Sequence, residues 1–423
     1  MSTELITLNF PSGWEEDKKG NPTRTHYCSG DLSELLRTHL GNNLRFNLLT
    51  LEPEINRCPV HLNFVENFYV FLSEKGFTIS KSAAMDALLY TAHQNAFHPV
   101  VDYLEQLEKD VSIDPINLEN VATDYLGSED DLSNQMLKTC LIGAVARALS
   151  RGIMFKHCLV LKGAQGIGKS SFWRTLASSE WFCDTMQNKD QDLLLSVQTT
   201  WIYELQELDY MTSKHEQGKL KAWLSSREDK FRVPYGRSTE THKRPSIFVG
   251  TCNRSDFLTD STGNVRFWII DLNKKIDLPK VQRDRDKIFK AAVIAYRKKE
   301  DYFNKNGIAL NDQLQRESDL RNEEYEAEHP FFPRLAEWTS RTVNQYPFTT
   351  DQALIGSGCR SEQRINNNDT KEAGNCLRKL GYVKDTHQRR EAGNKRLRRW
   401  RLPTWPKDET PLKIEMPNKL HGF

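Results

Sequence analysis

The sequence lacks the features that mark secreted, membrane-spanning and zinc-binding proteins. No apolar run approaches the roughly 20 residues that a membrane helix needs. The N-terminus, MSTELITLNF, has no basic-then-apolar signal pattern. The eight cysteines are scattered, without a Cys-x-x-Cys pair or a His/Cys cluster at zinc spacing. We therefore expect a soluble cytoplasmic protein with reduced thiols and no membrane partner.

The sequence also has little net charge, no internal repeats and no low-complexity tract. A net charge of +2 over 423 residues says little about partners, so the distribution of charge along the chain is more informative than its sum. The hydrophobic fraction of 38% suffices for packed cores, and the length predicts two or three domains of about 150 residues each. We divide the chain into a mostly helical N-terminal region at 1–130, a core at 131–310, a charged connector at 311–340, and a C-terminal domain with its tail at 341–423.

Hydrophobic periodicity changes character along the chain. Prolines and glycines punctuate residues 1–60, which we expect to be irregular. Helical spacing then predicts helices over 62–77, 82–109, 118–127 and 132–150. Beyond these, the short apolar runs HCLVLKG, TTWIYEL and PSIFVGTCN alternate with helical segments at 169–179 and 213–226. This alternation predicts an α/β fold, with flanking helices around a parallel sheet. Charged surface helices are expected at 285–304 and 314–328, the second within an acidic, solvated connector.

A glycine-rich run follows the first of these strands. LVLKGAQGIGKSS matches the phosphate-binding pattern G-x(4)-G-K-[ST] in its required context, between an apolar strand and a helix. Glycines let the backbone fold around phosphates with its N–H groups pointing inward. Lys169 can reach the β- and γ-phosphates of ATP, and the Ser170 hydroxyl can ligate Mg²⁺. A turn that matches by chance is the alternative. The predicted ATP site comprises Gly163, Ala164, Gln165, Gly166, Ile167, Gly168, Lys169, Ser170 and Ser171.

A phosphate-binding loop needs a carboxylate on a neighbouring strand, to hold Mg²⁺ and polarise the attacking water. The next apolar run, TTWIYELQELD, ends at Glu204, with Glu207 and Asp209 beyond it. The 35 positions from Lys169 to Glu204 leave room for one helix and a short additional element. We expect Glu204 to hold the metal together with Ser170. Glu207 fits a water-orienting role and a helix-capping role equally well, whereas Asp209 is better explained as a cap.

The third apolar run ends in polar residues, Asn253 and Arg254, and Arg266 precedes a further apolar run. In ring ATPases, a polar residue at the tip of the strand between the phosphate-loop strand and the acidic strand bonds the γ-phosphate or the water. Asn253 fits that sensor role. Arg266 can act as an arginine finger on a neighbouring subunit's nucleotide, with Arg254 as a rival. The alternatives are a turn former for Asn253 and a structural ion pair for Arg266.

Several blocks of sequence, in order, resemble the virulence-associated protein E family of P-loop ATPases from phages and mobile elements. That family is similar to superfamily 3 helicases and to the helicase half of phage-type primase-helicases. The resemblance covers residues 75–275 and rests on NAFHPVVDYLEQLE, LIGAVARAL, LVLKGAQGIGKSSFWRTLA, WIYELQELD, LKAWLSSREDKFRVPYGR and GTCNRSDFLTDSTGNVRFW. Two positions depart from the family. Val265 stands where a first arginine usually precedes Phe-Trp, which leaves Arg266 as the finger candidate. KDVSID replaces a tryptophan-aspartate-glycine turn.

The resemblance implies an AAA+-like P-loop NTPase core and an ATP-driven ring, a hexamer, that moves on DNA. It places the protein in replication of a phage or mobile element within a bacterial cell. Lys169, Ser170, Glu204 and Asn253 take the same NTPase roles by this resemblance. The residues before the core carry neither a zinc ribbon nor a paired-acid strand motif. A primase or polymerase is therefore expected as a separate partner.

Two basic segments are expected to face DNA. In superfamily 3 helicases a hairpin between the acidic and sensor strands projects into the pore and grips single-stranded DNA. Here DKFRVPYGRSTETHKRP reads as two short strands around Gly236, with cations for phosphates and an aromatic ring for a base. Some of its arginines could instead pair with acids at subunit interfaces. The expected contacts are Arg232, Tyr235, Arg237, Lys243 and Arg244.

The second basic segment lies near the C-terminus. Residues 378–401 contain ten Lys/Arg against two Asp/Glu. Helical patterns at 349–356, 361–366 and 368–380 precede two strands joined by an EAGN turn. This combination resembles a winged helix, whose wing lies along duplex phosphates. A solvated charged face is the alternative. The expected contacts are Arg389, Arg390, Lys395, Arg396, Arg398 and Arg399.

Together these predictions describe an ATP-dependent DNA helicase with a winged-helix-like C-terminal domain. An ATP-dependent origin-binding initiator or helicase loader, without unwinding activity, is the alternative. A small-molecule kinase would need a substrate lid and no basic wing. A packaging motor would carry a nuclease domain, and no downstream acidic cluster suggests one.

Overall fold

The computed structural model describes residues 10–185, 190–206, 208, 214–233, 238–254, 257–258, 264–299, 303–304, 307–326, 328–341, 346–384, 389–390, 396–397 and 399–404. The chain divides into two compact units, Met1–Glu326 and Ala327–Phe423. The division falls within the stretch 311–340 that we expected to be a connector.

The N-terminal part of the first unit contains helices and short strands around a core of its own. Its helices are α1 (Ser29–Leu40), α2 (Leu62–Glu74) and α3 (Lys81–Gln94). Strands β1 (Trp14–Glu16), β2 (Pro22–His26) and β6 (Phe77–Thr78) form one sheet, and β5 (Cys58–Pro59), β4 (Glu52–Ile55), β3 (Leu44–Asn47) and β7 (Ala96–Phe97) form another.

This region corrects two expectations. The stretch 1–60 is not simply irregular, because Leu32, Leu36 and Leu40 recur at helical spacing and are buried in α1. The single helix expected over 82–109 is interrupted by β7, which pairs with β3, and Pro99 then begins α4 (Pro99–Lys109). Proline is well tolerated at the first turn of a helix, so a new helix starts there.

A five-stranded parallel sheet forms the centre of the first unit, as the alternation of strands and helices predicts. The strands are β8 (Cys158–Gly163), β9 (Phe182–Cys183), β10 (Ile202–Leu205), β13 (Ile247–Cys252) and β14 (Phe267–Leu272), in the order β14-β8-β13-β10-β9. All four pairings are parallel. The strand β9 and a second helix, α8 (Asp190–Gln198), lie between the glycine-rich run and β10, where we expected room for one helix and a short element.

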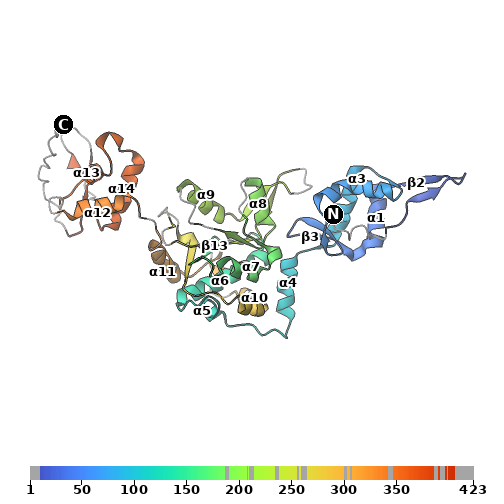
Figure 1. The fold of residues 1–423 in the computed structure, drawn as a ribbon, viewed down its shortest axis with the longest axis horizontal. Coiled ribbons are helices and arrows are strands. Elements are labelled where there is room, and N and C mark those ends of the chain that lie inside the picture. The colour runs from blue at the N-terminus through green and yellow to red at the C-terminus, as the bar shows by residue number, and fades with distance from the viewer. Residues whose placement is uncertain are drawn as a thin grey trace. The chain divides into compact units, whose positions relative to one another are not determined.

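Helices cover both faces of this sheet. Alternate residues of each strand point to opposite faces, so Ile202, Val249 and Ile270 pack on one side and Tyr203, Phe248 and Ile269 on the other. The first side is covered by α6 (Asp131–Leu149), α7 (Lys169–Ala177) and α10 (Leu278–Lys298). The second is covered by α8 and α9 (Lys214–Leu224) (Figure 1).

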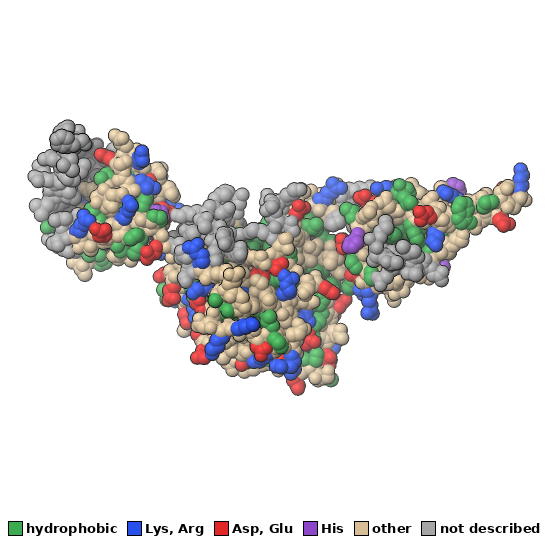
Figure 2. Space-filling view, viewed as in Figure 1, with side chains coloured by type: hydrophobic (Ala, Val, Ile, Leu, Met, Phe, Trp, Pro, Cys, Tyr) green, Lys and Arg blue, Asp and Glu red, His purple; other side chains and the backbone are tan. Residues whose placement is uncertain are grey.

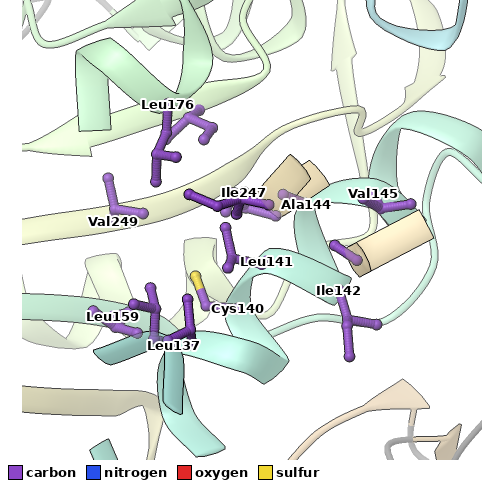
Figure 3. Close-up of a cluster of buried hydrophobic side chains, with 14 of the residues drawn as sticks. Leu137, Cys140, Leu141, Ile142, Ala144, Val145, Leu159, Leu176, Ile247 and Val249 are labelled. Carbon is purple, nitrogen blue, oxygen red and sulfur yellow. The ribbon is translucent and has the colours of Figure 1, made fainter. Parts of the chain in front are cut away.

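Helix α6 is the most enclosed element of the sheet's surroundings. Of its 19 residues, 16 are buried, so it has almost no solvent face. The apolar cluster that joins it to β8 and β13 includes Leu137, Leu141, Leu159 and Ile247 (Figure 3). Small helix α5 (Val121–Leu126), together with α4 and α10, covers its remaining sides. The burial of these apolar side chains stabilises the packing of α6 on one face of the sheet.

A hairpin, β11 (Glu228–Phe231) with β12 (Glu240–Lys243), confirms the two short strands predicted around Gly236. Arg244, expected to contact DNA, is instead fully buried at its base. Its Nη2 forms a short ion pair with Asp229, its Nε donates to Asp229 Oδ2 at 2.9 Å, and its Nη1 donates to Trp223 O at 2.7 Å. A bidentate carboxylate and a backbone carbonyl therefore hold this guanidinium away from solvent.

Helix α11 (Asp312–Glu323) packs against the sheet and is not the solvated connector that its charge run suggests. Asn322, 2% exposed, donates from Nδ2 to the carbonyls of Asn264 and Phe267, both at 2.9 Å. Arg321 pairs with Asp130 at 2.7 Å. Before α11 in the chain, β15 (Phe303–Asn304) and β16 (Gly307–Ile308) form an antiparallel pair. The charged residues of α11 thus lie on its outer side, while Ser318 and Asn322 on its inner side are buried against the core.

The second unit contains three helices and two pairs of short strands. Helices α12 (Phe331–Ser340), α13 (Thr350–Gly356) and α14 (Asn367–Lys379) share one apolar core. Strand β17 (Val383–Lys384) pairs with β20 (Trp400–Arg401), and β18 (Arg389–Arg390) with β19 (Arg396–Leu397), all antiparallel. Trp400 is fully buried and donates from Nε1 to Thr350 Oγ1 at 2.9 Å. It therefore fixes the strands to the helices.

The surface carries both signs of charge. Basic and acidic side chains are interspersed on the face of the molecule shown in Figure 2. Among the helices of the described ranges, none has the length and apolar character to cross a membrane. All eight cysteines are free thiols.

The Asp229–Arg244 pair gives the first test. Asp229→Asn is expected to lower the free energy of unfolding by about 3–5 kcal/mol, because it leaves the buried Arg244 charge without its carboxylate. Urea denaturation followed by tryptophan fluorescence measures the change. Glu228→Gln, one residue away on the exposed face of β11, should stay within about 0.5 kcal/mol. Equal effects of the two substitutions would show that Arg244 does not depend on the pair.

Candidate active site

The glycine-rich loop (Gly163–Gly168) links the end of β8 to the start of α7, and its glycines are required by its conformation. Gly166 and Gly168 have φ of 81° and 100°, in the left-handed region that side chains disfavour. A Cβ on Gly163 would lie 2.6 Å from Ile167 Cδ1 and 2.7 Å from Leu272 O. The loop therefore turns tightly against β14, and α7 begins at Lys169 with its backbone N–H groups toward the turn.

Lys169 ties this loop to the end of the neighbouring strand. Its Nζ donates to Gly163 O at 2.7 Å, Ala164 O at 2.9 Å and Asn253 Oδ1 at 2.8 Å. Lys169 is buried, whereas Asn253 is exposed just beyond β13. Since β13 lies between β8 and β10, Asn253 lies at the carboxyl end of the strand between the strand before the glycine-rich loop and the acidic strand.

Glu204 on β10 lies at the centre of the site. Its Oε1 accepts hydrogen bonds from Ser170 Oγ and Thr251 Oγ1, both at 2.7 Å. Its Oε2 is buried and accepts no hydrogen bond from the described part of the chain. Burial raises the pKa of Glu204, and the bonds from Ser170 and Thr251 partly offset the rise by favouring the carboxylate.

Two charged side chains that do not hydrogen-bond Glu204 also shift its pKa. Asp184, just after β9, raises the pKa of Glu204 and Arg174 of α7 lowers it. Arg174 and Asp184 pair with each other at 2.5 Å. Their opposed effects leave burial as the dominant influence on Glu204.

Thr251 is a site residue that the sequence interpretation missed. Val249 is the register partner of Glu204, and Thr251 follows it by two positions, so all three side chains point to the same face of the sheet. The signal was available: a hydroxyl residue two positions before Asn253, in a strand next to the acidic one. That Thr251 lies beside Glu204 could be recognised only once the order of the strands was known.

The two candidate finger arginines lie at opposite edges of the sheet. Arg254 directly follows Asn253 at the carboxyl end of β13. Arg266 directly precedes β14, whose first residue pairs with the first residue of β8, while its last pairs with Gly163. Six strand residues at about 3.3 Å each separate Arg266 from the glycine-rich loop by about 20 Å. Arg266 Nε donates to Ser225 Oγ at 2.8 Å.

The remaining predicted residues are partly described. Lys243 and Arg232 are exposed on the hairpin, and Arg399 is half-buried. Glu207, Asp209, Tyr235, Arg237, Lys395 and Arg398 lie outside the described residues, as do the side chains of Arg389, Arg390 and Arg396.

The raised pKa of Glu204 predicts a pH-dependent gain of stability in Glu204→Gln. A carboxyl group whose pKa is higher in the folded chain destabilises the fold when ionised. This effect is present above the folded pKa and fades as the pH falls through it. We expect Glu204→Gln to raise the melting temperature at neutral pH and the gain to shrink in acid, by differential scanning calorimetry. The exposed Glu180→Gln is the control. A gain that is independent of pH would contradict this assignment.

Comparison with known proteins identifies the family. No curated protein sequence is significantly similar to this chain. Three structures of the NrS-1 C-terminal region show partial likeness. The apo A form has 12% identity over 70% of this chain and 78% of that one, with a TM-score of 0.37. A second apo structure has 11% identity, coverages of 69% and 77%, and a TM-score of 0.37.

These TM-scores are too low to assign a fold or an activity. The model of the virulence-associated protein E-like domain, in contrast, matches residues 104–327. This match spans more than half of the chain and includes all five strands of the parallel sheet. The chain therefore belongs to the virulence-associated protein E-like domain family.

Proposed function

We propose that the chain is an ATP-dependent DNA helicase with a superfamily 3-like, AAA+-like P-loop core, acting in replication of a phage or mobile element. One observation carries the proposal. Lys169 and Ser170 from α7, Glu204 from β10 and Asn253 from the end of β13 meet at the carboxyl edge of the sheet. Open parallel sheets bind their ligands at this edge.

The residues fit a nucleotide triphosphate. The glycine-rich loop turns so that the N-terminus of α7 faces it, which favours anions. The Lys169 ammonium supplies a positive charge, and phosphate oxygens would replace the carbonyls that it now contacts. The exposed Asn253 amide would hydrogen-bond the terminal phosphate or the water.

The same residues fit Mg²⁺, which neutralises charge on the phosphates when it is bound. Two oxygen ligands are available: the Ser170 hydroxyl, and the buried Oε2 of Glu204, which accepts no hydrogen bond from the described residues. The described residues hold no cluster of three or more His, Cys, Asp and Glu placed for a metal. Glu204 and Ser170 together offer two oxygens, and Mg²⁺ takes one or two protein oxygens and completes its shell with phosphates and water.

Glu204 and Thr251 have different roles in the proposed site. The raised pKa of Glu204 brings this carboxylate closer to the range in which it accepts a proton. Thr251 holds Oε1 in place, so Oε2 points in one direction. Thr251 is thus a positioning residue, and Glu204 is the residue that contacts the reacting water or the metal.

A ring of identical copies, a hexamer, explains the location of Arg266. About 20 Å from its own loop, Arg266 cannot reach the nucleotide of the same chain. A head-to-tail ring brings the amino edge of one sheet against the carboxyl edge of the next, so Arg266 acts as the finger in trans. Arg254 lies at its own site and does not need a neighbour.

The second unit supplies a duplex-binding module in this proposal. Its three helices, the bridge from Phe348 to Trp400 and the β17–β20 pair follow the order of a winged helix. The β18–β19 pair would then lie along duplex phosphates as the wing. A separate primase or polymerase would act on the exposed strand.

Strand displacement tests the function directly. The purified chain should separate a forked duplex in the presence of ATP and Mg²⁺, and Lys169→Ala should reduce ATP hydrolysis by at least about 100-fold because the phosphates lose their cation. Lys298→Ala, exposed at the end of α10, is the matched control. Hydrolysis without strand separation would favour an origin-binding initiator or helicase loader, and normal turnover by Lys169→Ala would reject the ATP site.

Mixing inactive variants tests the finger in trans. Lys169→Ala and Arg266→Ala should each be inactive alone, but an equimolar mixture should regain turnover at about a quarter of its interfaces, where an intact loop meets an intact Arg266. A mixture of Lys169→Ala with Glu204→Gln is the control. Both of these act in one site, so no interface is complete. Absence of rescue in the first mixture would place Arg266 outside the active site.

A further inference from the structure

A pocket of about 710 Å³ lies at the amino edge of the sheet, at the base of the β11–β12 hairpin. Three cations line it: Arg151 beyond the end of α6, Arg227 between α9 and β11, and Lys243 at the end of β12. The hydroxyls of Ser150, Ser225 and Ser226 line it as well. The residues that line the pocket thus offer mainly positive charge and hydrogen-bond donors.

None of these three cations forms an ion pair within the described ranges, although Glu228 lines the same pocket. Like charges gathered in one hollow repel one another, and the cost rises when burial removes water. Arg151 is half-buried, and burial lowers its pKa. A cluster of this kind is best compensated by a ligand that brings several negative charges.

The two guanidinium groups are held in place for such a ligand. Arg227 Nε donates to Gly152 O, and Arg151 Nη2 donates to Leu48 O, both at 2.8 Å. Among the described residues, each guanidinium donates one hydrogen bond, to a backbone carbonyl, so its other N–H groups can contact a ligand. Fixed planar donors of this kind match the oxygens of a phosphate group.

The cations continue outside the pocket. On β11, Glu228 and Lys230 alternate with the buried Asp229 and Phe231, and Arg232 follows on the exposed side. Register pairs Glu228 with Lys243 and Lys230 with Thr241, so these side chains share the outer face. Lys230 and Arg232 therefore extend the cationic lining at intervals of about 7 Å. A small anion would need the pocket alone, whereas a polymer with a charge on every repeat would use the row.

We propose that the pocket and the outer face of the hairpin bind the phosphate groups of a single nucleic-acid strand. The pocket is too small to admit a duplex. This proposal deepens the DNA partner of the proposed function. Of the DNA contacts expected from the sequence, the proposal keeps Lys243 and Arg232 and omits the buried Arg244. It adds Arg151, Arg227 and Lys230. Arg266 lies next to the same pocket through Ser225, so strand and finger share the amino edge of the sheet.

Fluorescence anisotropy with a labelled oligothymidine of about 20 nucleotides, longer than one binding site, tests this in full-length protein. Arg227→Glu and Lys243→Glu should each weaken binding by about 10-fold or more and reduce the slope of log affinity against log salt by about 1. Lys18→Glu, an exposed cation in the turn between β1 and β2, makes the same charge change and should alter affinity less than about twofold. Lys243→Glu retains the Cβ and Cγ atoms beside Gly152, so it serves as the variant that keeps the packing.

The titration contains no ATP, so its outcome does not depend on whether the chain hydrolyses ATP. Unchanged affinity in both pocket variants would overturn the proposal. So would a loss of ATP or pyrophosphate binding with oligothymidine binding intact, because the pocket would then serve a small phosphate ligand.

Discussion

The carboxylate of Glu204 is the junction on which the candidate site depends. One oxygen accepts hydrogen bonds from Ser170 on α7 and from Thr251 on β13, so a single group fixes a helix and two strands relative to one another. Lys169 adds the link from the glycine-rich loop to Asn253. These bonds can form because parallel strands all end at the same edge. The apolar layers on both faces of the sheet keep the strands in register.

The sheet also separates two chemistries. Its carboxyl edge carries the glycine-rich loop and the buried carboxylate. Its amino edge carries Arg266, the base of the hairpin and the pocket lined by Arg151, Arg227 and Lys243. A packed parallel sheet deforms little, so a displacement of one edge is transmitted to the other. In the proposed motor, this rigidity connects the nucleotide of one subunit with the strand and with the next subunit.

The sequence was most informative where chemistry depends on residues close together in the chain. The glycine-rich loop, the strands that follow it and the polar ends of β10 and β13 could all be located, since turn glycines and apolar runs are local signals. Arg244 was misassigned because its partners, Asp229 and Trp223, are identified only by tertiary packing. Thr251 was missed for the same reason. The strands of the N-terminal region have two to five residues each, too few for a period to be read.

Helix α6 was predicted within one residue at each end, yet its surroundings could not be foreseen. Its sequence shows no polar face, and the structure encloses 16 of its 19 residues. Such a helix gains little from forming alone in water, since its stability comes from the layers that surround it. The strands, α6 and the covering helices therefore depend on one another for their stability. Partial intermediates would expose a long apolar surface and be prone to aggregation.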